Sequence, residues 1–154
     1  MFRICKAFHI ESGHLLSKHP ERCRFPHGHS RRVEIVLSAP TLDDNDMVCD
    51  FKWVKLAVKA HLDEYDHAMC VSAKDPHLDD LTRGEHRVVV FEEGDPTTEL
   101  LAKRIHEFLS RRIIAGEAFT TDNGVTYHIR QDVRVERVRV SETPSTWAEY
   151  RQDL

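Results

Sequence analysis

The chain of 154 residues carries a net charge of −4 at pH 7, with 40% hydrophobic and 31% charged residues. This length suits a single domain covering residues 1–154, in which folding buries roughly two thirds of the surface that the unfolded chain exposes. Because the chain is slightly acidic and no apolar run approaches the ~20 residues that cross a bilayer, we expect no nucleic acid and no membrane as a partner.

The N-terminal part of the chain predicts two antiparallel strands. A first strand of about ten residues is indicated by apolar side chains on one period-2 face: Phe2, Ile4, Phe8 and Ile10. This alternation lacks the continuous apolar stretch of a signal peptide, so we expect a cytoplasmic protein. A second alternating run precedes Pro40 and an acidic turn and contains Val33, Ile35 and Leu37.

Two amphipathic helices are predicted further along the chain. Asp50 has the position of an N-cap, because apolar residues follow it at helical spacing: Phe51, Val54, Val58, Leu62 and Tyr65. Asp95 supplies a second N-cap, with Pro96 at the first helical position. We expect this second helix to end near Gly116.

The remaining segments complete an α+β pattern. A polar loop leads to a short strand at residues 88–91, and the turn signal at residues 121–124 separates two more short strands. The last strand is marked by Val133, Val135, Val138 and Val140, and the change of phase at Glu136 and Arg137 predicts a β-bulge. These elements predict an antiparallel sheet with two helices on one face.

The segment CRFPHGHS is the first that suggests chemistry. His27 and His29 project to the same side of an extended segment, and Gly28 lets the backbone approach closely. His14 lies just beyond the first strand, so hairpin closure would add the third imidazole that a catalytic zinc commonly needs. In a chain with 11 histidines, chance or packing could also account for the HxH pair.

The four cysteines form no CxxC pair, so we expect reduced thiols and no disulfide framework. Cys23 lies beside basic residues and a possible metal, which favours the thiolate. It could be a zinc ligand, a base or a small buried hydrophobe. The neighbouring basic residues could form an anion site or a solvated face: Lys18, Arg22, Arg24, Arg31 and Arg32.

Several motifs, in order along nearly the whole chain, resemble the family of 6-pyruvoyltetrahydropterin and 6-carboxytetrahydropterin synthases. They are FHIESGH, CRFPHGHS, CDF, EYDHAMC, DPTTELLAKRI and RVSETPSTWAEY. The resemblance implies the tunnelling fold, in which subunits associate edge to edge into a β-barrel with substrate sites between them. It also implies a homohexamer made of two trimers, and such closure removes the exposed edges of an open sheet.

The resemblance implies a zinc site with a neighbouring base. His14, His27 and His29 would bind Zn²⁺ and leave one position for the side-chain hydroxyls of the substrate. Polarisation of these hydroxyls would acidify the neighbouring C–H bonds. Cys23 would then be the base that removes a proton from carbon.

The resemblance also implies a proton-transfer pair and a pterin site. Asp66 and His67 would form the pair, since a carboxylate fixes the tautomer of an imidazole and raises its basicity. Their contact would need a turn or a partner subunit, and a helix cap is the alternative role. Glu142 would accept the two donors of the pterin edge, with Thr97 and Thr98 beside it. An exposed glutamate and a helix N-cap are the alternatives for these residues.

Both branches of this family act on 7,8-dihydroneopterin triphosphate. One eliminates triphosphate with internal redox to give 6-pyruvoyltetrahydropterin. The other also loses acetaldehyde and gives 6-carboxy-5,6,7,8-tetrahydropterin on the queuosine pathway. The short spacing between Cys23 and His27 resembles the bacterial carboxy-forming branch, which we therefore expect. A pyruvoyl-forming synthase and a zinc or pterin-binding module without catalysis are the alternatives.

Overall fold

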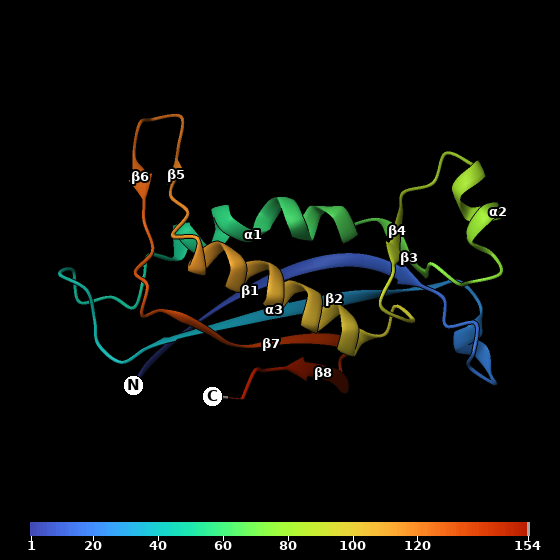
Figure 1. Ribbon diagram of the computed structural model, residues 1–154. Coiled ribbons are helices and arrows are strands. Elements are labelled where there is room, and N and C mark those ends of the chain that lie inside the picture. Colours follow the sequence, from blue (N-terminus) through green and yellow to red (C-terminus); the bar gives the residue numbers. More distant parts are fainter. Residues whose placement is uncertain (154) are drawn as a thin grey trace.

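The computed structural model describes residues 1–153, in which a six-stranded mixed sheet is covered by two long helices on one face (Figure 1). The strands are β1 (Phe2–His14), β2 (His27–Ala39), β3 (Ala68–Ser72), β4 (Val88–Phe91), β7 (Arg134–Thr143) and β8 (Thr146–Tyr150), in the spatial order β4-β3-β1-β2-β7-β8. The helices are α1 (Phe51–Tyr65), α2 (Leu78–Arg83) and α3 (Thr98–Ile114), with a 3-10 turn η1 (Arg22–Arg24). A small hairpin pairs β5 (Phe119–Thr120) with β6 (Thr126–Tyr127).

The predicted antiparallel pair at the N-terminus is confirmed as β1 and β2. Each strand has 13 residues, so both are longer than the apolar alternation indicates. The alternation of buried residues continues through polar side chains, because Ser12 and His14 are as deeply buried as Ile10. His14 is consequently the last residue of β1 and pairs with His27, whereas the sequence predicts it beyond the strand.

Helix α1 begins as predicted, and α3 begins later than predicted. The Asp50 side chain accepts the backbone N–H of Lys52 and caps α1. The prediction of Asp95 as the N-cap of α3 is wrong, because Thr97 caps this helix and Pro96 lies before it. The carbonyl of Pro96 instead accepts a hydrogen bond from His14. In residues 1–153, no helix is long and apolar enough to cross a bilayer.

The core lies between the sheet and the two long helices. Its fully buried side chains include Trp53 and Val58 of α1, Ile105 of α3 and Val138 of β7. Phe51 departs from the predicted apolar stripe of α1, since it is 48% exposed. Removal of apolar surface from water in this layer stabilises the fold by about 25 cal/mol per Å², and this burial drives the helices onto one face of the sheet.

The sheet differs from the predicted antiparallel arrangement at one edge. Strands β1, β2, β7 and β8 are antiparallel neighbours, but β3 runs parallel to β1, and β4 runs parallel to β3. Strand β3 begins shortly after α1 ends and pairs only with the last three residues of β1. The segment expected to be a polar loop therefore contains β3 and α2, and β8 is a further strand that the alternation does not reveal.

Two local predictions near the C-terminus are confirmed. Val36 pairs with Arg137 and Leu37 with Val135, which leaves Glu136 as the extra residue of a β-bulge. Gly124 has a φ of 82° in the turn between β5 and β6, a conformation that glycine adopts without steric cost.

His61 of α1 makes the stability of the fold dependent on pH. Its ring is buried and stacked on Phe108, with the ring centroids 3.9 Å apart. Burial is the main cause that lowers the pKa of His61 to about 4, and the charge of Arg104 contributes. The unfolded chain therefore binds more protons than the folded chain between pH 4 and the ordinary histidine pKa of 6.5, and the free energy of unfolding decreases as pH falls through this window.

We expect His61→Leu to reduce by about one the number of protons that the chain takes up on unfolding near pH 5. Urea unfolding between pH 4.5 and 7, with a chelator present, measures this number from the slope of stability against pH. His9→Ala, which removes an exposed histidine from β1, should keep the wild-type slope. A His61→Leu variant with the wild-type slope would contradict the assignment.

Candidate metal centre

The end of the β1–β2 hairpin brings three imidazoles together. His14 pairs with His27, and Ser12 pairs with His29, so the three histidine side chains project to the helix-covered face. The Nε2 atom of His14 lies 3.0 Å from Nε2 of His27 and 3.1 Å from Nε2 of His29. These three side chains could hold a metal ion.

The other ring nitrogens orient two of the imidazoles toward a cation. Nδ1–H of His14 donates to the carbonyl of Pro96 at 2.8 Å, and Nδ1–H of His27 donates to the carbonyl of Phe25 at 2.7 Å. With the proton on Nδ1, each Nε2 carries an unshared electron pair that faces the neighbouring imidazoles. Such pairs repel each other unless a cation lies between them, so the donor set fits a divalent metal.

Burial keeps His14 and His29 in the neutral form that binds metals. It lowers the pKa of His14 to about 4, although the hydrogen bond to Pro96 opposes this effect. Burial also lowers the pKa of His29, and the charge of Arg31 contributes. Protons therefore compete with a metal for these nitrogens only in acidic solution.

Glu142 of β7 lies beside the three histidines. Its Oε1 atom is 3.7 Å from Nε2 of His14 and 3.7 Å from Nε2 of His29. The Thr98 hydroxyl donates to the same oxygen at 2.9 Å. Burial alone raises the pKa of Glu142, but the hydrogen bond from Thr98 and the nearby histidines lower it on balance, so a carboxylate faces the site at neutral pH.

The two threonines at the start of α3 have different partners. Thr98 is buried and bonded to Glu142, whereas the Thr97 hydroxyl accepts the backbone N–H of Leu100 and caps the helix. The helix-cap alternative is therefore confirmed for Thr97. Thr98 is the threonine whose side chain reaches Glu142.

Asp66 and His67 contact each other within one chain. Asp66 Oδ2 lies 3.2 Å from Nδ1 of His67, and Asp66 Oδ1 accepts the backbone N–H of Glu11 at 2.8 Å. This backbone hydrogen bond is the main cause that lowers the pKa of Asp66. His67 has a φ of 56°, in the left-handed region that residues other than glycine rarely adopt. Asp66 also occupies the C-cap position of α1, so the cap and the pair coexist.

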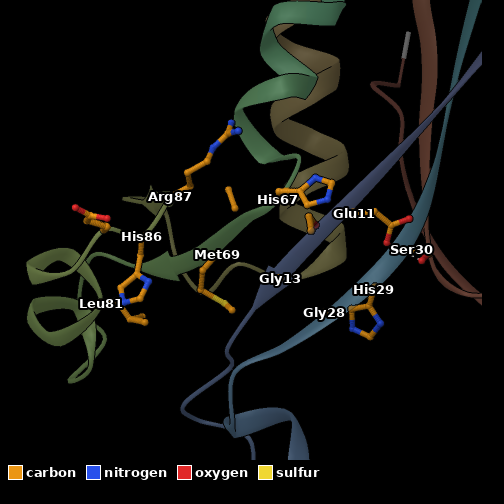
Figure 2. Close-up of a pocket in the computed structure, with 13 residues that line it drawn as sticks. Glu11, Gly13, Gly28, His29, Ser30, His67, Met69, Leu81, His86 and Arg87 are labelled. Atoms are coloured by element: carbon orange, nitrogen blue, oxygen red, sulfur yellow. Dashed lines mark hydrogen bonds between the residues drawn. The ribbon is translucent and has the colours of Figure 1, made fainter.

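His67 lines a cavity between the ends of β1 and β2 and the segment that carries α2 (Figure 2). Gly13 and His29 contribute from the hairpin, and His86 and Arg87 contribute from the segment after α2. The long segment after His67 therefore builds one wall of this cavity. A Cβ atom at Gly13 would lie 2.7 Å from the terminal methyl carbon Cε of Met69, so glycine leaves room for the side chain of Met69 against β1.

Cys23 lies in η1, in the connection between β1 and β2. It is half-buried, and its carbonyl accepts the backbone N–H of Leu16 at 3.0 Å, which keeps η1 close to the end of β1. Within residues 1–153, the group of side chains that could hold a metal contains the three histidines and not Cys23. The three histidines therefore form the candidate ligand set, and the role of Cys23 as a base stays a prediction.

The basic residues near the histidines differ in exposure in the folded chain. Lys18 is exposed and lies 3.7 Å from Asp95. Arg31 is only 2% exposed, so the solvated-face interpretation is wrong for this residue. The signal for its burial was available in the alternation of β2, since Arg31 has the same parity as His29 and Val33.

Comparisons with known proteins agree with this geometry. The sequence profile described as 6-pyruvoyl tetrahydropterin synthase matches residues 3–153. The chain is 30% identical to the 6-carboxy-5,6,7,8-tetrahydropterin synthase of Aquifex aeolicus over 171 residues, which covers 99% of each chain. The enzyme of the same name from Haemophilus influenzae is 25% identical over 99% of this chain and 100% of its own length.

Solved structures show the same fold. An uncharacterized protein from Wolinella succinogenes superimposes with a TM-score of 0.75 at 22% identity, over 99% of this chain and 98% of its own. The 6-pyruvoyl tetrahydropterin synthase of Plasmodium vivax superimposes with a TM-score of 0.67 at 16% identity, over the full length of both chains.

Proposed function

Because the chain belongs to the 6-pyruvoyl tetrahydropterin synthase family, we propose that it is a zinc-dependent lyase of the carboxy-forming branch. It converts 7,8-dihydroneopterin triphosphate and one water molecule to 6-carboxy-5,6,7,8-tetrahydropterin, acetaldehyde and triphosphate, in the cytoplasm and on the queuosine pathway. The observation that carries this proposal is the convergence of three imidazole Nε2 atoms beside Glu142, in a chain 30% identical to a carboxy-forming synthase over its full length.

In this proposal, His14, His27 and His29 hold Zn²⁺, which supplies Lewis acidity toward the side-chain hydroxyls of the substrate. The carbonyls of Pro96 and Phe25 support this role, because each accepts from Nδ1–H and so leaves Nε2 of His14 and of His27 directed toward the site. Orientation by backbone groups costs no rearrangement when the substrate arrives.

Glu142 binds the pterin ring. The 2-amino group and the ring N–H of a pterin present two donors on one edge, and a carboxylate can accept both. The Thr98 hydroxyl holds the carboxylate from behind, and Thr97 keeps the start of α3 in place. The proximity of Glu142 to the histidines supports a substrate that contacts the carboxylate and the metal together.

Two groups move protons in the proposed reaction. Cys23 acts as the base toward carbon. Asp66 keeps the proton of His67 on Nδ1, so that Nε2 of His67 can accept or return a proton on the cavity side.

We also propose that the active protein is a hexamer of two trimers. Strands β4 and β8 form the two edges of the sheet, and an unpaired edge favours pairing with another chain. Edge-to-edge association would close the sheets into a barrel with sites between subunits. Light scattering during size-exclusion chromatography should give six times the 17.9 kDa mass of the chain, and a monomer would contradict the barrel.

The release of triphosphate distinguishes an enzyme from a binding module without catalysis. Zinc-loaded protein should release triphosphate from 7,8-dihydroneopterin triphosphate, and chelator-treated protein should regain this activity when zinc is returned. A zinc-loaded protein that binds the pterin and releases no triphosphate would contradict the proposed lyase.

A further inference from the structure

Arg31 places a positive charge in the interior beside the proposed pterin site. Its side chain is 2% exposed, in β2, two positions after His29. The guanidinium is held by neutral groups: Nε donates to the Ser12 hydroxyl at 2.9 Å, and Nη1 donates to the Thr98 hydroxyl at 2.8 Å. A longer contact of 3.5 Å joins Nη1 to the carbonyl of Ser141. Burial of a guanidinium is costly, so its retention at this position calls for a role.

The direction of the hydrogen bonds leads from Arg31 to Glu142. A guanidinium can only donate, so the Thr98 hydroxyl must accept the bond from Nη1. The proton of this hydroxyl is then directed at Oε1 of Glu142, 2.9 Å away. Without Arg31, the hydroxyl could rotate to other partners. Arg31 therefore determines which way Thr98 donates.

The backbone alone does not place the Glu142 carboxylate. Glu142 lies where the pairing of β7 with β8 changes register, between Ser141 and Thr143. Its side chain is 35% exposed and lies 3.7 Å from two histidine nitrogens. The position of the carboxylate consequently depends on the bond from Thr98, which Arg31 maintains.

We propose that Arg31 is a positioning residue, which acts through the Thr98 hydroxyl to hold the Glu142 carboxylate where it accepts the amino edge of a pterin. This inference rests on the proposed function, because that function makes Glu142 the pterin anchor. It assigns to Arg31 an internal role in place of the anion contact that its charge suggests.

The test compares two ligands that differ at the recognised edge. Pterin and lumazine, which has an oxo group in place of the 2-amino group, are titrated into zinc-loaded wild-type protein and Arg31→Met by fluorescence. We expect wild-type protein to prefer pterin. In Arg31→Met, the affinity for pterin should fall by about 10- to 100-fold, the loss expected for a hydrogen-bonded charged group, while the affinity for lumazine changes by less than about 3-fold.

Further variants separate positioning from a general loss of structure. Thr98→Val interrupts the same path at its middle, and it carries the test if Arg31→Met does not fold. Both single variants and the double variant should lose pterin preference to a similar extent, because they break one path. Arg130→Met removes an arginine that bonds Thr41 and Asp132, outside the site, and it should keep the wild-type preference.

The outcomes distinguish this inference from the proposed function. Wild-type protein that prefers pterin, together with an Arg31→Met variant or a Thr98→Val variant that keeps this preference, would overturn the role of Arg31 alone. Additive losses in the double variant would also overturn it. Wild-type protein without any preference for pterin would overturn the proposed function, and the inference with it.

Discussion

Replacing His27 with alanine is expected to remove the bound metal and to lower kcat/KM by at least about 10³-fold, since metal catalysis supplies several kcal/mol of transition-state stabilisation. The variant would leave two of the three nitrogens that converge at 3.0 to 3.1 Å. His27 is the suitable choice because it is half-buried, whereas His14 is 1% exposed and its loss would leave a hole in the interior.

The measurement combines metal analysis with a steady-state assay. The metal content of purified His27→Ala should fall from about one ion per chain to nearly none, with an unchanged circular dichroism spectrum. His9→Ala, on the same hairpin and away from the cluster, should retain both metal and activity. A His27→Ala protein that keeps a full equivalent of metal would show that the three imidazoles are not the ligands.

The second large effect is expected for Cys23→Ala, in which turnover should fall by about 10²- to 10⁴-fold, the range of general-base catalysis. The metal should remain bound, because the three histidines form the cluster without Cys23. The decrease should appear in kcat more than in the affinity for pterin, since Glu142 and Thr98 are untouched.

Cys5→Ala is the matched control for this variant. Cys5 is an exposed residue of β1. Partial burial of its thiol raises the pKa, and the negative charge of Glu34 contributes, so Cys5 is unsuited to act as a thiolate base. We expect this control to have wild-type turnover. Undiminished turnover in Cys23→Ala would refute the base assignment, and loss of metal in that variant would make Cys23 a ligand.

The part of the fold that could be predicted is the part with local signals. The alternation in β1 and β2 is sufficient to pair them, and this pairing alone brings His14 to His27. The start of α1 follows from Asp50, whose carboxylate satisfies a free N–H of the first turn. The bulge at Glu136 follows from a break in the period of valines.

The missed elements depend on contacts between distant segments. Strand β3 has only three residue pairs with β1, and α2 has six residues with no buried side chain, so neither carries a periodic pattern. Asp95 and Pro96 resemble a helix start, but the carbonyl of Pro96 serves His14, 82 residues away in sequence. A tertiary hydrogen bond of this kind overrides a local preference.

In the candidate site, too, residues with local sequence signals were predictable, and residues whose role depends on distant contacts were not. The three histidines are predictable from the hairpin, and the resemblance supplies roles for Cys23 and Glu142. The burial of Arg31 was not expected, because a charged residue beside other basic residues is usually solvated. Its partners Ser12 and Thr98 lie on separate elements, and only the folded chain brings them together.

The most direct test of the proposed reaction is the identification of the products by mass spectrometry after zinc-loaded protein is incubated with 7,8-dihydroneopterin triphosphate. We predict 6-carboxy-5,6,7,8-tetrahydropterin, acetaldehyde and triphosphate in equal amounts. A pyruvoyl product with triphosphate and no acetaldehyde would contradict the carboxy-forming reaction and assign the chain to the other branch of its family.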